Sequence, residues 1–232
     1  MAALRFKKND DEGAWVCGWE FELAARAEGA HWIAGVDEVG RGPLFGPVVA
    51  AAVILPAGAD LDGLTDSKKL SERDRERFDE QVRKVAVAWA VAEVDAATID
   101  RINILEASRL AMRIAAERLE PAGRCADWLL VDGNQRVPMS CKQTTIVKGD
   151  ARSISIAAAS VVAKVHRDRM MRELEEQFPG YGIGRNMGYP TAEHREALKR
   201  LGATAMHRRS FAPVAQVCGR ARVYGQLRLV EE

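Results

Sequence analysis

The chain has 232 residues, 47% hydrophobic and 29% charged, a balance that is typical of a globular protein and excludes a disordered, fibrous or disulfide-stapled chain. The formal net charge of +1 lacks the excess of Lys and Arg that nucleic-acid-binding domains usually carry. The charge is unevenly placed, however, because residues 1–149 sum to −4 and residues 150–232 to +5, with no acid between His207 and Val230. The total charge therefore excludes no binding function.

The N-terminus and the apolar runs indicate a cytoplasmic protein. No apolar segment follows the basic residues of MAALRFKKND, and every apolar run is far shorter than the roughly 20 residues that span a bilayer. The four cysteines form no CxxC pair, which argues against a disulfide framework or a structural zinc site.

Five short apolar runs predict β-strands. In chain order they are residues 31–37, 48–56, 85–94, 127–134 and 144–150. Helices are predicted for part of a leader at 1–30, from the capping pair Ser71 and Asp74 onward, and at 96–119, 153–178 and 191–202. Residues 40–47 and 178–190 are rich in Gly and Pro and predict loops. This order predicts a mixed sheet flanked by helices, an α/β fold.

Acidic residues end several of these strands. Asp37 and Glu38 end the first strand, Asp132 ends the fourth, and Asp150 lies between the fifth strand and the long helix. If these strands are neighbours, the carboxylates converge at one rim of the sheet and raise one another's pKa. A hard divalent cation relieves that repulsion, and an all-oxygen ligand set favours Mg²⁺ or Mn²⁺ over zinc. Two such ions would suit displacement at a phosphodiester.

A structural interpretation of the same acids stays open. An acid after a strand also serves as a turn former or helix cap. Because neighbours on a strand point to opposite faces, Asp37 and Glu38 can serve together only if Glu38 lies past the regular strand or uses its backbone carbonyl. Asp168 lies four residues before Arg172, the spacing of an ordinary helix surface pair, and we set it aside as a ligand.

Three further features are candidates for contact with nucleic acid. Gly40, Arg41 and Gly42 either let a strand approach the backbone closely or form a tight turn with a solvated arginine. Lys68 either contacts phosphate or belongs to a solvated charge run. Tyr189, between Gly and Pro, either stacks on a sugar or base or packs its own loop.

Six segments, in order from about Trp32 to Val214, resemble the bacterial ribonuclease HII family. They are AGVDEVGRGPLFGPVVAAAVIL, DSKKLS, LLVDGN, VKGDARSISIAAASVVAKVHRDRM, NMGYPTAEH and HRRSFAPV. The resemblance implies a ribonuclease H-like mixed five-stranded sheet flanked by helices, with a small helical C-terminal extension. The implied division is a leader at 1–30, a catalytic domain at 31–202 and a basic extension at 203–232.

The resemblance also implies an activity. The expected enzyme is a metal-dependent endonuclease that hydrolyses the RNA strand of RNA–DNA hybrids and cleaves 5′ of ribonucleotides embedded in duplex DNA. It would use two Mn²⁺ or Mg²⁺ ions and leave 3′-hydroxyl and 5′-phosphate ends. A monomer is expected, and contact with a replication clamp is left open.

The same resemblance implies roles for individual residues. Asp37, Glu38 and Asp132 would be the principal metal ligands, and Asp150 the fourth active-site carboxylate. The backbone of Gly40, Arg41 and Gly42 would read the ribose 2′-hydroxyl, Tyr189 would pack on the adjacent deoxyribose, and Lys68 would contact phosphate.

Two residues depart from the family pattern. Phe45 stands where the family usually has a small residue, and it either fills a gap in the core or changes how closely the substrate approaches. Met187 replaces a more typical lysine before the Gly-Tyr pair. Two other functions remain open on the residues alone: a different two-metal nuclease on the same fold, such as a junction resolvase, and a hybrid-binding module without activity.

Overall fold

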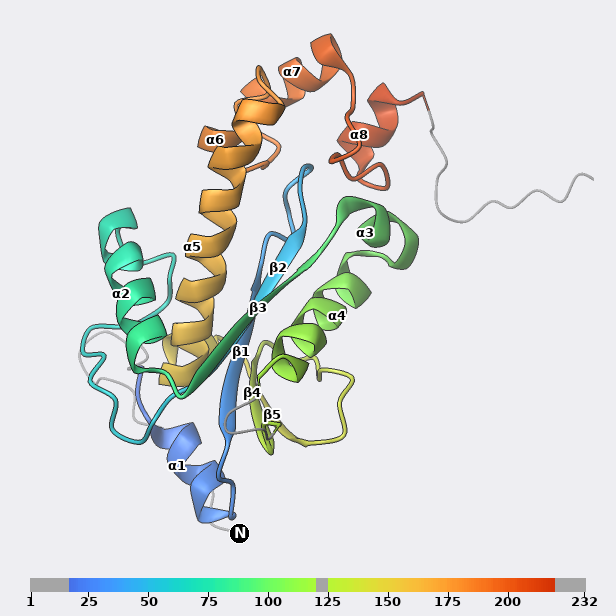
Figure 1. The fold of residues 1–232 in the computed structure, drawn as a ribbon. Helices are drawn as coiled ribbons and strands as arrows, with labels where there is room; N and C mark the ends of the chain where they lie inside the picture. Colours follow the sequence, from blue (N-terminus) through green and yellow to red (C-terminus); the bar gives the residue numbers. More distant parts are fainter. Residues whose placement is uncertain (1–16, 120–124, 220–232) are drawn as a thin grey trace, which may run out of the picture.

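The structure is a computed structural model that describes residues 17–119 and 125–219. Its centre is a five-stranded sheet in the order β3-β2-β1-β4-β5 (Figure 1). The strands are β1 (Ile33–Val39), β2 (Val48–Ile54), β3 (Ala88–Val94), β4 (Trp128–Asp132) and β5 (Lys142–Ile146). β1 pairs antiparallel with β2, and β2 with β3, whereas β1, β4 and β5 run parallel. The predicted mixed α/β sheet is thus confirmed.

The helices have the following bounds. They are α1 (Glu20–Ala27), α2 (Glu72–Val85), α3 (Ala96–Ile102), α4 (Ile104–Glu117), α5 (Ile154–Gln177), α6 (Ile183–Asn186), α7 (Ala192–Leu201) and α8 (Ala212–Val217), with a 3-10 turn η2 (Gly149–Ala151). The predicted start of α2 is confirmed, because the Ser71 side chain accepts a hydrogen bond from the Asp74 amide. Leader residues 1–16 and extension residues 220–232 lie outside the described part of the chain.

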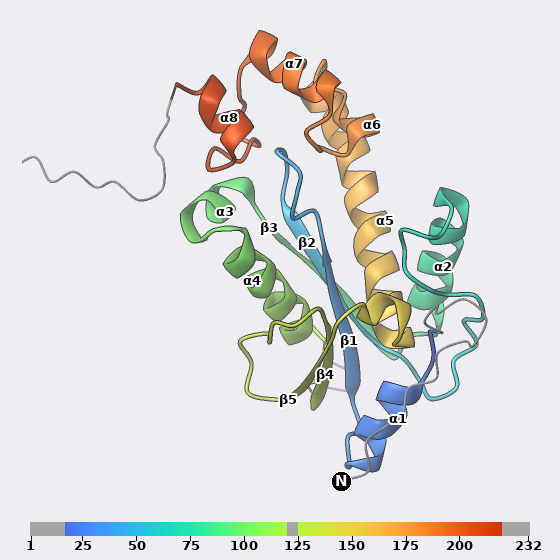
Figure 2. The same cartoon turned by 180° about the vertical axis from the view of Figure 1, so that it is seen from behind.

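The sheet lies between two helical layers. Both views show α5 and α2 over one face and α4 over the other (Figures 1 and 2). The contact between β1 and α5 depends on Gly35, since a Cβ there would lie 2.1 Å from the carbonyl carbon of Ser155. The apolar side chains of β1 and β2 are buried between these layers, which fixes the register of the two strands.

The first strand runs from Ile33 to Val39, two residues past its predicted end, so that Glu38 lies inside it. Two further differences are larger. The helix expected at 96–119 is interrupted at Asn103, which has a φ of 68° and whose side chain accepts hydrogen bonds from the amides of Leu105 and Glu106. The fifth strand runs from Lys142 to Ile146, earlier than expected, and the left-handed Lys148 (φ 57°) turns the chain out of the sheet. Asp150 therefore lies in a 3-10 turn rather than at a strand end.

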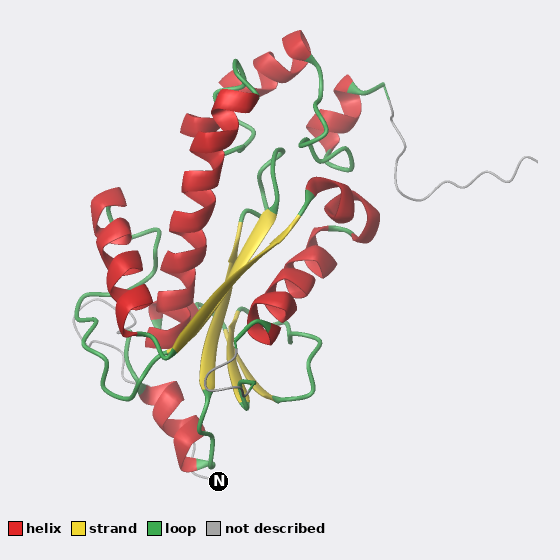
Figure 3. Ribbon diagram, in the orientation of Figure 1, coloured by secondary structure: helices red, strands yellow, loops and turns green. Residues whose placement is uncertain are grey.

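C-terminal to β5, the described part of the chain contains helices and loops but no further strand of the sheet (Figure 3). The segment 178–190, predicted to be a loop, contains the short helix α6, and the predicted helical extension contains α8. Val214 of α8 packs with Leu44 and Leu198, so the extension rests on the loop between β1 and β2. In the described ranges no helix combines the length and the apolar character needed to cross a membrane.

Candidate active site

Three acids meet where the parallel strands end. In the parallel register of β1 and β4, Val36 lies beside Val131, so the next residues, Asp37 and Asp132, are neighbours on the same face. Asp150 follows β5 in the turn that precedes α5. The Gly149 amide donates to the Asp132 carboxylate at 2.7 Å, which joins this turn to β4. The predicted convergence of Asp37, Asp132 and Asp150 agrees with this geometry.

Burial and mutual repulsion raise the pKa of two of these acids, Asp37 and Asp150. Asp37 is 6% exposed, and burial, together with the charges of Glu38, Asp132 and Asp150, raises its pKa well above the usual range. Burial and the charge of Asp132 also raise the pKa of Asp150, although Lys68 lowers it. The carboxylates are therefore close enough to oppose one another's ionisation.

Glu38 differs from the other acids. It lies inside β1, not past its end, so by strand alternation its side chain leaves the sheet on the face opposite to Asp37. Its carboxylate accepts a hydrogen bond from Arg41 at 3.1 Å. Burial, first, and the charge of Asp132 raise the pKa of Glu38, whereas Arg41 lowers it.

The chemistry of these residues fits a hard divalent cation. The donors are carboxylate oxygens, and their raised pKa values mean that a positive charge placed among them would relieve a real repulsion. In residues 17–119 and 125–219, however, no group of three or more His, Cys, Asp or Glu side chains has the arrangement of a formed metal site.

The loop after β1 lies against Tyr189. Gly40 has a φ of 88°, and a Cβ there would lie 2.3 Å from Nε of Arg167, so the loop requires glycine at this position. A Cβ on Gly42 would lie 3.5 Å from the Tyr189 ring. Arg41 and Gly42 are exposed, and Tyr189 is 42% exposed. The two features predicted separately to contact nucleic acid thus form one surface.

Lys68 belongs to the same site. Its Nζ lies 3.5 Å from a carboxylate oxygen of Asp150 and 4.0 Å from one of Asp66. Neighbouring acids raise the Lys68 pKa against the opposing effect of burial, so the ammonium stays charged beside the carboxylates.

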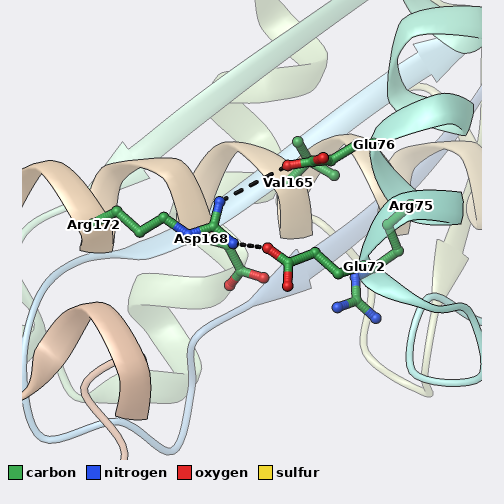
Figure 4. A pocket seen from close by; sticks show the side chains of 6 residues that line it. All are labelled: Glu72, Arg75, Glu76, Val165, Asp168 and Arg172. Carbon is green, nitrogen blue, oxygen red and sulfur yellow. Dashed lines mark hydrogen bonds and ion pairs between the residues drawn. The ribbon is translucent and has the colours of Figure 1, made fainter.

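The pairing predicted for Asp168 is wrong. Asp168 is 7% exposed and binds Lys164 at 2.6 Å, whereas Arg172 reaches across to Glu72 and Glu76 of α2 (Figure 4). The packing of α5 against α2 supplies these partners, which spacing along one helix does not reveal.

Phe45 and Met187 are the two residues that depart from the ribonuclease HII pattern. Phe45 is fully buried, and its ring lies edge-on to those of Phe178 and His207, with centroid distances of 5.4 and 5.0 Å. It fills the core beneath the loop, which is one of the two alternatives considered. Met187 adopts a left-handed φ of 51°, and its carbonyl accepts a hydrogen bond from Arg167 at 2.9 Å.

Several supporting residues were not identified from the sequence. Ser160 hydrogen-bonds to Asp37 and lies 2.8 Å from the Ser67 hydroxyl, so it connects the acid to the segment before α2. Glu22, in the leader, accepts hydrogen bonds from the Ser153 hydroxyl at 2.7 Å and the Ser155 amide at 3.0 Å, at the start of α5. The sequence signal for Glu22 was weak, because an acid on an amphipathic helix is usually solvated.

A buried pair of histidines supports the Tyr189 loop. Nε2 of His194 lies 3.3 Å from Nε2 of His207, and Nδ1 of His194 lies 2.9 Å from the Tyr189 carbonyl. The Thr204 amide donates to Nδ1 of His207 at 3.1 Å. These contacts require that both rings are neutral, with His207 donating to His194 and His194 donating to Tyr189.

Comparisons with known proteins agree with this geometry. The family model described as "Ribonuclease HII" matches residues 34–214. The ribonuclease HII of Bacillus subtilis is 52% identical over 200 residues, covering 86% of this chain and 77% of that protein. The ribonuclease HII of Ruegeria pomeroyi is 53% identical over 201 residues, covering 86% and 84%.

Solved structures show the same fold. The RNase HII in a PCNA:RNase HII complex from Archaeoglobus fulgidus is 28% identical with a TM-score of 0.64, covering 77% of this chain and 94% of that one. Bst-RNase HIII in complex with Mn²⁺ is 22% identical with a TM-score of 0.68, covering 86% and 73%. The sheet and its helices are thus a ribonuclease H-like fold, as expected. Its buried acids, and a family model that spans them, lead to one conclusion: the chain belongs to the ribonuclease HII family of metal-dependent endoribonucleases, which cleave RNA in RNA–DNA hybrids.

Proposed function

We propose that this chain cleaves on the 5′ side of ribonucleotides embedded in duplex DNA, as well as the RNA strand of longer hybrids, and leaves 3′-hydroxyl and 5′-phosphate ends. The observation that carries the proposal is that β1, which places Asp37 beside Asp132 of β4, leads directly into the loop whose Gly42 position contacts the Tyr189 ring. The acids by themselves are compatible with any metal-dependent nuclease. The surface formed by Gly42 and Tyr189 would add contacts to a sugar.

Asp37, Glu38, Asp132 and Asp150 would hold two divalent cations, Mn²⁺ or Mg²⁺. When bound, such ions lower the pKa of a water molecule that attacks the phosphorus and stabilise the departing 3′ oxygen. The protein keeps these acids in place through Ser160, which binds Asp37, and the Gly149 amide, which binds Asp132. Because its side chain leaves β1 on the face opposite to Asp37, Glu38 would contribute its backbone carbonyl, and its carboxylate would keep the hydrogen bond with Arg41.

The remaining candidate residues would bind the substrate. The backbone of Gly40, Arg41 and Gly42 would hydrogen-bond to the ribose 2′-hydroxyl, the group by which a protein distinguishes RNA from DNA. The exposed Tyr189 ring, in contact with the same loop, would pack on the adjacent deoxyribose. Lys68, whose ammonium is beside Asp150, would contact a phosphate.

Residues 31–202 would form the catalytic domain, between a leader at 1–30 and a basic extension at 203–232. The protein would act as a cytoplasmic monomer. Contact with a replication clamp is supported by the complex of the Archaeoglobus fulgidus relative, and co-elution of the purified chain with its clamp would test it.

One assay tests the function. A DNA duplex with a single ribonucleotide is incubated with the protein and Mn²⁺ or Mg²⁺, beside an all-DNA duplex of the same sequence and a reaction with EDTA. We expect one cut, 5′ of the ribonucleotide, only with metal. Cleavage of the all-DNA duplex would favour a structure-specific nuclease. Binding without cleavage under every condition would favour a module without activity.

A further inference from the structure

Arg208, in the C-terminal extension, is a buried charge whose hydrogen-bond partners are backbone carbonyls. Its side chain is fully buried, and the described carboxylate that acts on its charge is Asp100, which raises its pKa against the larger effect of burial. The guanidinium donates to three backbone carbonyls of the loop after β1: Gly40 at 2.6 Å, Arg41 at 3.0 Å and Gly46 at 3.0 Å. Burial lowers the Arg208 pKa to about 9. Burying the charge of an arginine costs free energy, so these hydrogen bonds must offset that cost.

Peptide geometry shows what these hydrogen bonds do. In a trans peptide the carbonyl of one residue and the N–H of the next point in opposite directions, and all described peptide bonds are trans. Arg208 draws the carbonyls of Gly40 and Arg41 inward, so the N–H groups of Arg41 and Gly42 point outward. Both residues are exposed, and neither amide donates to an acceptor within residues 17–119 and 125–219.

The extension itself is fixed against the loop. His207 forms an antiparallel bridge with Phe45, the Arg208 amide donates to the Leu44 carbonyl at 2.8 Å, and the Gly46 amide donates to the Met206 carbonyl at 2.9 Å. These backbone contacts therefore hold the Arg208 guanidinium next to the carbonyls that it binds. The loop rests between the extension on one side and Tyr189 on the other.

We propose that Arg208 is a positioning residue for recognition of the ribonucleotide. By binding the carbonyls of Gly40 and Arg41, it fixes two outward amides as donors for the ribose 2′-hydroxyl. The inference rests on the proposed function, and it assigns to Arg208 an effect on selectivity without contact to the substrate. Arginine suits the task because its planar fork carries five donors, whereas the compact lysine ammonium cannot hold three carbonyls in this arrangement.

The test compares Arg208→Lys, which retains the charge, with Arg209→Lys, a change at the adjacent exposed arginine. Each protein is titrated in EDTA with two fluorescent duplexes that differ by a single 2′-hydroxyl, and the ratio of the two dissociation constants is recorded. An inactive or unfolded fraction affects both titrations equally, so a purely structural defect leaves this ratio unchanged.

We expect Arg208→Lys to reduce the ratio about three- to tenfold, the loss of one or two neutral hydrogen bonds, while its affinity for all-DNA stays within about twofold. Arg209→Lys keeps the wild-type ratio. If Arg208→Lys has the same ratio as the wild-type protein, the role of Arg208 is overturned, whereas the proposed function is not. A wild-type ratio near one would instead contradict the proposed reading of the 2′-hydroxyl.

A second measurement needs no variant. Hydrogen exchange of the segment 40–46 in the wild-type protein is followed with each duplex. We expect slower exchange with the ribonucleotide duplex than with the all-DNA duplex, because the outward amides acquire an acceptor. Equal exchange with both duplexes counts against the proposal even if Arg208→Lys does not fold.

Discussion

Asp37, a proposed metal ligand, lies in an environment that opposes its ionisation. The sequence located it because it follows an apolar strand, and adjacent parallel strands bring Asp132 to the same place. It did not locate Ser160, the hydroxyl partner of Asp37, because a serine in an alanine-rich helix carries no pattern of its own. Nor did it settle Glu38, whose partner Arg41 depends on the conformation of the following turn.

Asp37→Asn should separate stability from activity. Removing a carboxylate whose pKa is raised by burial and by its neighbours should raise the melting temperature of the metal-free protein by a few degrees. Cleavage at a ribonucleotide should fall at least about 100-fold, because a cation ligand is lost. Scanning calorimetry in EDTA and a single-turnover cleavage assay measure the two effects.

The control is Asp60→Asn, at an exposed acid away from the strand ends. It should change neither quantity. A lower metal-free melting temperature for Asp37→Asn would show that its hydrogen bonds outweigh the repulsion. Cleavage near the wild-type rate would refute its role as a ligand.

Tyr189→Ala should reduce selectivity more than general affinity. The ring is 42% exposed and lies against the Gly42 position, so its loss would remove the apolar surface that we propose packs on a sugar, but no charge. We expect kcat/KM at an embedded ribonucleotide to fall about tenfold or more. Leu201→Ala, at another exposed apolar residue (44%), provides the control. Equal losses in cleavage and in all-DNA binding would contradict the assignment.

At the scale of elements, the sequence predicted the five strands well, since each is an apolar run bounded by turn residues. It predicted one helix at 96–119, because apolar periodicity continues through Asn103, where the backbone turns to positive φ and a new helix is capped. It placed the fifth strand too late, because Lys148 in a left-handed conformation resembles any other lysine in the sequence. Interruptions set by one dihedral angle are not visible in a hydrophobic pattern.

The start of α5 depends on the leader. Glu22 of α1 is 2% exposed, and one of its oxygens binds Ser153 and the Ser155 amide while the other has no described partner. Glu22→Ala should therefore destabilise the fold by about 1–3 kcal/mol, because it leaves buried donors unpaired. Glu22→Gln should cost less, since the amide oxygen still accepts and no buried charge remains.

Chemical denaturation of the three proteins measures these free energies, with Glu20→Ala, at an exposed acid of the same helix, as the matched control. If Glu22→Ala unfolds at the wild-type denaturant concentration, the leader does not stabilise α5 through this carboxylate.

At the scale of the whole molecule, the family resemblance predicted the overall architecture, but residue spacing could not reveal contacts between its ends. His194 and His207 form a buried pair below Tyr189, and two scattered histidines gave no reason to connect them. Arg208 appeared only as one of several basic residues near the C-terminus. Its function as an internal donor becomes visible once the extension is packed on the loop.

The histidine pair predicts a pH dependence of stability. Burial, and then the nearby His194, lowers the pKa of His207 from 6.5 to about 4. As the pH falls from about 6.5 towards 4, the unfolded chain takes up a proton that folded His207 does not. The free energy of unfolding should therefore decrease by up to about 1.4 kcal/mol per pH unit, and this contribution is fully present only above pH 6.5.

His207→Gln should flatten that part of the profile, whereas His31→Gln, at an exposed histidine, should leave it unchanged. Urea denaturation at a series of pH values between 4 and 8 gives both profiles, and the difference between proteins removes the contribution of other groups. Parallel wild-type and His207→Gln profiles would contradict the low pKa of His207.

The bond between Arg208 and Gly40, residues 168 positions apart in the chain, has a consequence for biosynthesis. The four acids lie within the first 150 residues, so a growing chain carries its acidic half long before residue 208 leaves the ribosome. At about 5–20 residues per second, several seconds separate the two. A nascent or prematurely terminated chain would hold the proposed metal ligands without the Arg208 contacts, and the proposed selectivity would be among the last properties that synthesis completes.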